Sequence, residues 1–234
     1  AARPGPARQS KARQRKARFF THNEDIWEMS TATKSDTRLD VVTRKVRLEG
    51  IRDVMFSRYA GDNKTKLEWH QKIYLVPGTN ILALPAINIS SFLSAHNTNS
   101  APKRLRDKRQ YKDICNACLS FVSITGPSDC ANGQYIPFLR DGKRIEVGKF
   151  GDDADPVSGI YLHRAVARLD KGIPNPQERP VLPGPWSLEF DLTIFPNKEI
   201  KEQEIRNLFD EGGLAIGLGT FRGVFGKFVV AEWK

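Results

Sequence analysis

Residues 212–228, GGLAIGLGTFRGVFGKF, indicate more about the fold than any other part of this chain. Glycines alternate there with apolar residues, and the only charges are Arg222 and Lys227. Glycine adopts positive φ and lets another backbone approach closely. Gly217 and Gly219 are therefore expected either to allow close approach of a partner molecule or to satisfy a positive-φ turn.

Clear periodic patterns flank this glycine-rich loop. Residues 186–194 alternate apolar and polar side chains, which is typical of a strand buried on one face. Residues 201–212 carry apolar residues at helical spacing and acids in the first turn, with Gly212-Gly213 as the expected helix end. Residues 225–233 are rich in β-branched and aromatic residues and predict a closing strand. The unit is strand, helix, glycine-rich loop, strand.

This order argues against a nucleotide cofactor. In a dinucleotide fingerprint the glycines follow a strand and open a helix, whose N-terminus holds the pyrophosphate. Here the glycines follow a helix and open a strand, so the loop offers no helix N-terminus to a phosphate. No cofactor is predicted.

The net charge of +10 is concentrated at the N-terminus. We predict a flexible basic arm over residues 1–35 and a folded domain over residues 36–234. The arm is expected to contact a polyanion, and the alternative is a solubilising tail. Residues 1–18 contain seven basic residues and no acid: Arg3, Arg8, Lys11, Arg13, Arg15, Lys16 and Arg18.

A second basic cluster lies at residues 101–112, where only Asp107 opposes the positive charges and Tyr111 is interleaved. A cluster of this density is expected either to touch nucleic acid or to form a solvated surface. Its cations are Lys103, Arg104, Arg106, Lys108, Arg109 and Lys112.

The first half of the chain predicts a strand over residues 42–50, a short helix or turn over 53–59, and a hairpin over 72–83 around Pro77-Gly78. Residues 85–93 predict a helix capped by Asn88 or Ser90. The N–H groups of its first turn, with the hydroxyls of Ser90 and Ser91, form a possible phosphate seat. The alternative is ordinary helix capping.

The second half predicts a hairpin around Asp141-Gly142 and a strand over residues 161–169 that places Arg164 and His163 on opposite faces. Residues 171–184 carry four prolines and predict an extended linker.

Possible metal sites are few. Cys115 and Cys118 have zinc-like spacing, with Cys130 or His163 as further ligands, but core thiols are the favoured interpretation. Three cysteines without a secretion signal point to a reducing cytosol. No apolar run approaches the ~20 residues of a membrane span.

No catalytic motif appears in the sequence, so we predict that the chain is not an enzyme and binds no metal. An acidic group at residues 152–155 resembles a metal loop in composition only, and a metal-dependent nuclease using it is a further alternative. Its members are Asp152, Asp153 and Asp155.

The pattern of a helix, Gly-X-Gly and Phe-Gly-Lys-Phe-Val-Val resembles the C-terminal glycine-rich loop of the RAMP superfamily, the proteins that form the backbone of CRISPR effector complexes. Residues 84–93 are similar to the strand-Pro-Ser-helix segment that meets guide RNA in backbone subunits. The chain also resembles RAMP-like proteins associated with bacteriophage genomes. The loop positions that carry the resemblance are Gly217, Gly219, Gly223, Gly226, Lys227 and Val229.

This resemblance implies an α+β fold: an RRM- or ferredoxin-like antiparallel sheet with helices on one face, inserted loops and the basic arm. It implies a non-catalytic subunit that coats guide-type single-stranded RNA, because no general-base His of the RNA-processing members can be placed. Expected partners are RNA, copies of itself in a filament and other effector subunits, in the (host) cytoplasm and without a membrane. The alternative is a phage structural or assembly protein whose arm contacts nucleic acid or a neighbouring subunit. The expected RNA contacts are Arg13, Arg15, Lys16, Arg18, Asn88, Ser90, Ser91, Lys103, Arg104, Arg106, Lys108, Arg109, Arg164, Gly217, Gly219, Arg222 and Lys227.

Overall fold

The computed structural model describes residues 40–62, 64–94, 111–168 and 174–234. The basic arm therefore lies outside the described residues, and so do five cations of the second basic cluster. These five are Lys103, Arg104, Arg106, Lys108 and Arg109.

Four strands form the centre of the fold: β1 (Val42–Gly50), β4 (Val122–Thr125), β9 (Ser187–Ile194) and β10 (Phe228–Trp233). They are paired in the order β10-β1-β9-β4, and every pairing is antiparallel. With helices between β1 and β4 and between β9 and β10, the chain order is βαββαβ. The first strand thus lies between the fourth and the third, which is the ferredoxin-like arrangement. The predicted α+β antiparallel fold is confirmed.

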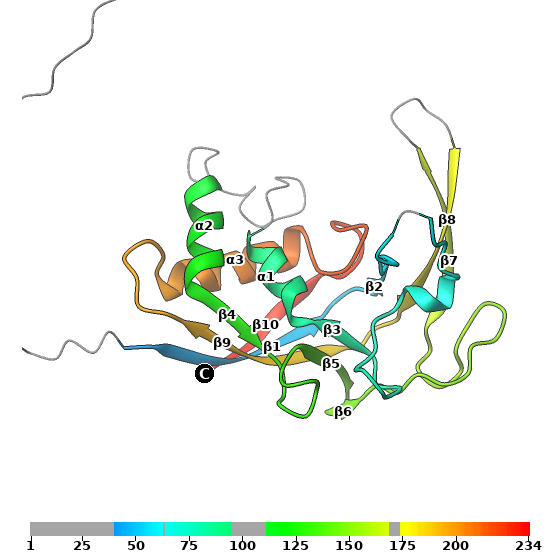
Figure 1. The fold of residues 1–234 in the computed structure, drawn as a ribbon, viewed down its shortest axis with the longest axis horizontal. Coiled ribbons are helices and arrows are strands. Elements are labelled where there is room, and N and C mark those ends of the chain that lie inside the picture. Colours follow the sequence, from blue (N-terminus) through cyan, green and yellow to red (C-terminus); the bar gives the residue numbers. More distant parts are fainter. Residues whose placement is uncertain (1–39, 63, 95–110, 169–173) are drawn as a thin grey trace, which may run out of the picture. The chain divides into compact units, whose positions relative to one another are not determined.

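The helices α1 (Ala86–Ser94), α2 (Tyr111–Phe121) and α3 (Glu202–Ala215) lie on one side of this sheet (Figure 1). The alternation in β9 turns Leu188, Phe190, Leu192 and Ile194 into the core beneath them. Phe209 of α3 packs its ring against the rings of Phe92, Phe190 and Trp233. The strands expected near residues 42–50, 186–194 and 225–233 and the helix between the last two are confirmed.

Two insertions extend this core. Between β1 and α1 the chain forms β2 (Val54–Met55), the 3-10 helix η1 (Trp69–Lys72) and β3 (Ala83–Pro85). Between β4 and β9 it forms β5 (Tyr135–Arg140), β6 (Lys143–Arg144), β7 (Tyr161–Arg168) and β8 (Pro174–Leu182). β5 adds β3 and β6 to the main sheet, whereas β2, β8 and β7 form a separate three-stranded sheet.

Both predicted hairpins are present. The turn at residues 77–78 is closed by a hydrogen bond from the Val76 N–H to the Ile81 carbonyl at 2.9 Å. At the second turn, Leu139 of β5 pairs with Arg144 of β6.

The proline-rich segment is a strand, and the predicted linker is wrong. β7 pairs with β8 along its whole length, from Tyr161↔Val181 to Arg168↔Pro174. The Pro180 carbonyl accepts the Phe56 N–H from the β2 side, so the N–H positions of Pro180 and Pro176 face away from β7. The missing proline donors therefore cost the β7–β8 ladder no hydrogen bond.

Two other boundaries differ from prediction. Residues 54–55 are strand rather than helix or turn, because they pair with Leu182 and Val181 on the edge of β8 that faces away from β7. Helix α3 does not stop at Gly212-Gly213 but runs to Ala215. A Cβ at Gly213 would lie 2.6 Å from the Phe228 carbonyl oxygen, so this glycine lets β10 approach the helix and does not end it.

Candidate nucleic-acid interface

The glycine-rich loop folds tightly back on itself after α3. Four of its glycines have positive φ: Gly217 (84°), Gly219 (76°), Gly223 (96°) and Gly226 (71°). The Leu218 N–H donates to the Gly226 carbonyl at 2.9 Å, and the Gly223 N–H donates to the Ile216 carbonyl at 2.6 Å. These bonds give the loop a defined conformation.

The loop is also bound to the segment that follows β1. The Gly226 N–H donates to the Asp53 carbonyl at 2.6 Å, and the Thr220 N–H donates to the Met55 carbonyl at 2.9 Å. A Cβ at Gly219 would lie 2.5 Å from the Met55 oxygen, and one at Gly217 would lie 2.6 Å from the Gly226 oxygen. Of the two roles expected for Gly217 and Gly219, the structure supports the positive-φ turn packed against the chain itself. Their contact with RNA stays a prediction.

Three rings gather at the apex of the loop. Phe221, at a φ of 55°, leaves 52% of its surface exposed. Phe225 stands edge-on to the His163 ring of β7, with ring centroids 5.4 Å apart, and lies 6.4 Å from Phe221. The glycine-rich loop and the β7–β8 hairpin therefore present aromatic surface together.

Beside these rings is a hollow of about 450 Å³, lined by Arg52, Asp53, Gly223, Val224, Phe225 and Lys227. Asp53 is the one acid in this lining, and its carboxylate accepts hydrogen bonds from the Tyr161 hydroxyl at 3.0 Å and the Gly184 N–H at 3.1 Å. Burial, together with the bond to Asp53, raises the pKa of Tyr161 to about 12. Asp53 thus links β7, through its carboxylate, to the glycine-rich loop, through its backbone carbonyl, while Arg52 and Lys227 supply positive charge.

Arg222 is held within the loop. Its Nε donates to the Gly219 carbonyl at 3.1 Å, and burial lowers the pKa of its guanidinium. Arg222 therefore contributes to loop structure, and its predicted phosphate contact is untested.

More positive charge lies on the β7–β8 hairpin. Arg179 pairs across the ladder with His163, and its buried Nε makes no hydrogen bond within the described residues. Lys72 Nζ donates to the Glu178 carbonyl at 2.7 Å, and burial and then the charge of Arg179 lower the pKa of Lys72. Sequence reasoning missed Arg179 because it assigned β8 to a linker. It missed Arg52 because no motif marks it.

Arg164 lies on the other face of this hairpin. Its guanidinium pairs with Asp153 at 2.8 Å and with Glu178 at 3.3 Å. The structure therefore separates Arg164 from the His163 and Arg179 face, and its charge is compensated by two carboxylates.

The predicted cap of α1 is wrong. The helix begins at Ala86, whose N–H donates to the Gln134 carbonyl at 2.8 Å, so Asn88, Ser90 and Ser91 lie within the helix. Pro85 allows this earlier start because proline suits the entry to a helix. The hydroxyls of Ser90 and Ser91 are therefore not part of a capped first turn.

The sheet face opposite the helices is polar. Arg47 pairs there with Glu49 at 3.1 Å and with Glu189 at 3.7 Å. RNA-recognition motifs stack bases on aromatic residues of this face. In the described strands β1, β4, β9 and β10 this face carries no aromatic residue; its members include Thr43, Lys45, Arg47, Glu49, Ser123, Thr125, Glu189, Asp191 and Thr193.

Charge is divided unevenly along the chain. The described residues contain 22 Lys and Arg and 21 Asp and Glu, so they carry a net +1 of the total +10. The remaining +9 belongs to the segments outside them, chiefly 1–39 and 95–110. The two basic segments recognised in the sequence thus hold nearly all the excess positive charge.

The three thiols are buried, as the core interpretation predicted, and Cys115 Sγ donates a hydrogen bond to the Ser94 carbonyl. Asp155 accepts backbone N–H bonds from Gly148, Val157 and Ser158, and its bonding, first to the Ser158 hydroxyl, holds its pKa below the usual range despite burial. Within the described part of the chain, no three His, Cys, Asp or Glu side chains form a group that could hold a metal ion. In the same part, no helix is long and apolar enough to cross a membrane.

Comparisons with known proteins find one kind of similarity. No family model and no curated protein matches the chain. Among solved structures it is similar to a chain in the cryo-EM structure of the type III-B Cmr-beta bound to cognate target RNA, with a TM-score of 0.48 and 12% sequence identity. The match covers 84% of this chain and 61% of the other, so this chain spans less than two thirds of the length of its neighbour.

Proposed function

We propose that this chain binds single-stranded RNA at the surface formed by the glycine-rich loop and the β7–β8 hairpin. The observation that carries the proposal is the group of three rings, Phe221, Phe225 and His163, beside the cations Arg52 and Lys227. Proteins that bind single strands without sequence preference combine aromatic platforms for bases with cations that follow the backbone.

The geometry suits a preformed binding surface. The loop backbone is held by its own hydrogen bonds and by those to Asp53 and Met55, so this backbone needs little ordering when RNA binds. Rings accept any base because every base has a π-face, and phosphates are the same in every sequence. The interaction is therefore largely independent of sequence.

The two basic segments add to the attraction for RNA. The described residues carry a net charge of only +1, whereas segments 1–39 and 95–110 together carry +9, so in this proposal most of the phosphate-binding charge belongs to those two segments. Arg13, Arg15, Lys16 and Arg18 of the arm and the cations of the second basic cluster bind phosphates in this proposal.

The finer proposal is a non-catalytic, RAMP-like backbone subunit that coats guide-type RNA together with copies of itself and other effector subunits in the cytoplasm. It is supported by the motif resemblance over residues 84–93 and 186–230 and by the βαββαβ order of the core strands. The polar open face of the sheet is consistent with it, since RNA would be held at the loop and hairpin and not on that face.

The test is fluorescence anisotropy with a labelled single-stranded RNA at several salt concentrations. Arg52→Gln/Lys227→Gln should weaken binding and lower the salt slope by about 1.4, or about 0.7 per lost phosphate contact. Lys143→Gln/Lys198→Gln removes two exposed lysines outside this surface and is the matched control. Equal losses in both double variants would overturn the assignment of the surface.

Two further measurements address the finer proposal. Extracting RNA from the purified protein and sequencing it identifies what is bound. Incubating labelled RNA with the protein and Mg²⁺, free of contaminating nucleases, tests catalysis. Shortening of the RNA in the presence of Mg²⁺ would refute the non-catalytic assignment.

A further inference from the structure

We infer that a second cleft, between the segment 70–80 and strand β5, binds one nucleotide of the RNA, with the base on tyrosine rings and the phosphate on Arg58. The inference rests on the proposed function, because it takes its ligand from the same RNA. The cleft has a volume of about 670 Å³ and is lined by residues of five segments, among them Arg58, His70, Tyr74, Pro85, Tyr135 and Phe150. Ligand pockets commonly measure about 300–1,000 Å³, so the space suits a nucleotide.

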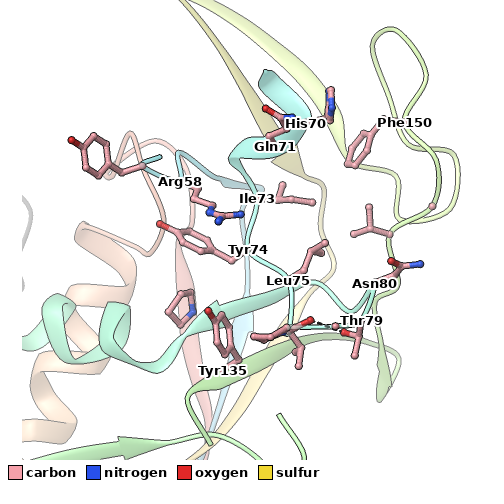
Figure 2. Close-up of a pocket in the computed structure, with 17 residues that line it drawn as sticks. Arg58, His70, Gln71, Ile73, Tyr74, Leu75, Thr79, Asn80, Tyr135 and Phe150 are labelled. Atoms are coloured by element: carbon pink, nitrogen blue, oxygen red, sulfur yellow. Dashed lines mark hydrogen bonds between the residues drawn. The ribbon is translucent and has the colours of Figure 1, made fainter. Parts of the chain in front are cut away.

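One wall is built by backbone pairing on the two sides of β3. The Ala83 N–H donates to the Tyr74 carbonyl at 3.0 Å, and Pro85 of β3 pairs with Tyr135 of β5, so the backbones that carry the two tyrosines flank β3. Figure 2 shows Tyr74 on one side of its chain segment and Ile73 and Leu75 on the other, with the Arg58 guanidinium next to the Tyr74 ring. Arg58 and both tyrosines are therefore on the same side of the cleft.

A small apolar cluster supports Tyr135. Val76, Ala83 and Cys130 form a small buried cluster against which Ile81 and Tyr135 pack. Tyr135 is thus held from behind while part of its ring remains accessible. A ring fixed in this way loses little freedom when a base stacks on it.

A second group of rings in the lining lies on the other side of the 73–75 segment. The Phe150 ring lies 5.6 Å from the His70 ring at an interplanar angle of 32°, and it stands edge-on to Trp69 at 5.2 Å. Trp69 is 7% exposed and anchors the pair to the core. Figure 2 shows Tyr74 and Tyr135 on one side of the 73–75 segment and His70 and Phe150 on the other, so the tyrosine side beside Arg58 is the one proposed for the base.

Charge favours a nucleotide over a peptide. Arg58 is the only Asp, Glu, Lys or Arg in the lining, and it is exposed and forms no salt bridge within the described residues. A single cation beside stacking surface matches one phosphate and its base. The Asn80 side chain also lines the cleft and brings an amide donor and acceptor that can meet a base edge.

A proline-rich peptide is the competing occupant, since such peptides dock into aromatic grooves. It would use the rings but has no phosphate for Arg58. The presence of Arg58 and the absence of acids from the lining therefore favour the nucleotide.

The test uses uridine 5′-monophosphate, uridine and ribose 5-phosphate, titrated into the full chain and followed by NMR shifts of the aromatic rings. We expect the nucleotide to bind at least about fivefold more tightly than ribose 5-phosphate, from stacking. Uridine, which lacks the phosphate, should bind more weakly than the nucleotide to the native chain. Arg58→Gln, a change at an exposed residue, should remove that difference.

Stacking is tested by Tyr74→Leu and Tyr135→Leu, with Tyr74→Phe and Tyr135→Phe as matched controls that keep the rings. The leucine variants should lose nucleotide binding by at least about fivefold, and the phenylalanine variants should retain it. If a leucine variant does not fold, the Arg58→Gln comparison still decides the result.

The outcomes separate this inference from the proposed function. Nucleotide binding no tighter than that of ribose 5-phosphate, with long RNA still bound through Arg52 and Lys227, overturns the cleft and leaves the proposed function standing. If the native chain does not bind long RNA, the proposed function itself is refuted. A proline-rich peptide that binds where the nucleotide does not would reassign the cleft to protein recognition.

Discussion

The substitution Gly219→Ala should destabilise the folded protein. The loss of folding free energy should be larger than at a glycine that only satisfies a positive-φ turn. Gly219 has a φ of 76°, where an L-residue costs about 1–2 kcal/mol. Its added Cβ would also lie 2.5 Å from the Met55 carbonyl oxygen and 3.0 Å from Val54 Cγ2. Overpacking of this kind costs about 1–3 kcal/mol more, so the expected total is about 2–5 kcal/mol.

Gly223→Ala is the matched control within the same loop. Gly223 has a φ of 96°, but a Cβ there would meet nothing within 4 Å. It should therefore lose only the conformational part, about 1–2 kcal/mol. The difference between the two variants isolates the steric contact with β2.

Thermal unfolding followed by circular dichroism measures both losses. For a chain of this size 1 kcal/mol corresponds to about 2–4 °C in Tm. Gly223→Ala should thus lower Tm by about 2–8 °C, and Gly219→Ala by about 4–20 °C. Equal shifts in the two variants would show that the loop moves away from Met55 at no cost, and would refute the close-approach argument.

Deleting residues 1–18 should weaken RNA binding and flatten its salt dependence with little change in Tm, because seven basic residues and no acid are removed; an unchanged salt slope would exclude the arm as an RNA contact. Replacing Arg104, Arg106 and Arg109 of the second basic cluster with alanine should lower RNA affinity, measured by anisotropy, without lowering Tm. An affinity equal to that of the native chain would mean that the cluster does not contact RNA. Tyr161→Phe should remove the part of the tyrosinate absorbance that appears at the highest pH in an alkaline titration, because the pKa of Tyr161 is raised to about 12. Since the folded state holds that proton above the ordinary pKa of 10.0, native stability should fall between about pH 10 and 12, and the variant should lose less over that range; an identical decline in both proteins would contradict the raised pKa.

Local periodicity was sufficient to predict the elements of the core. The alternation at residues 186–194 reflects burial on one face, and that pattern is written directly into the sequence. The helical spacing of Ile205, Leu208 and Phe209 did the same for α3. The strand-helix-loop-strand unit followed from these patterns alone.

Local chemistry failed where a distant segment decided the structure. The prolines of β8 favour a linker, but the ladder with β7 overrides them because their missing donors face away from it. Gly213 was expected to end a helix, yet the close approach of Phe228 is the reason for a glycine there. Neither contact is visible in a local window.

The candidate site divides in the same way. The glycine-rich loop, Lys227 and the two basic segments could be recognised before folding is considered, since composition and spacing mark them. Arg52, Phe225 and His163 come together only in the folded chain, from segments at least 62 residues apart in sequence, and the cleft of Arg58, Tyr74 and Tyr135 also forms only on folding. The physical reason is that such surfaces arise from strand pairing and packing over long sequence separations, whereas a sequence pattern records only the burial and charge of neighbouring residues.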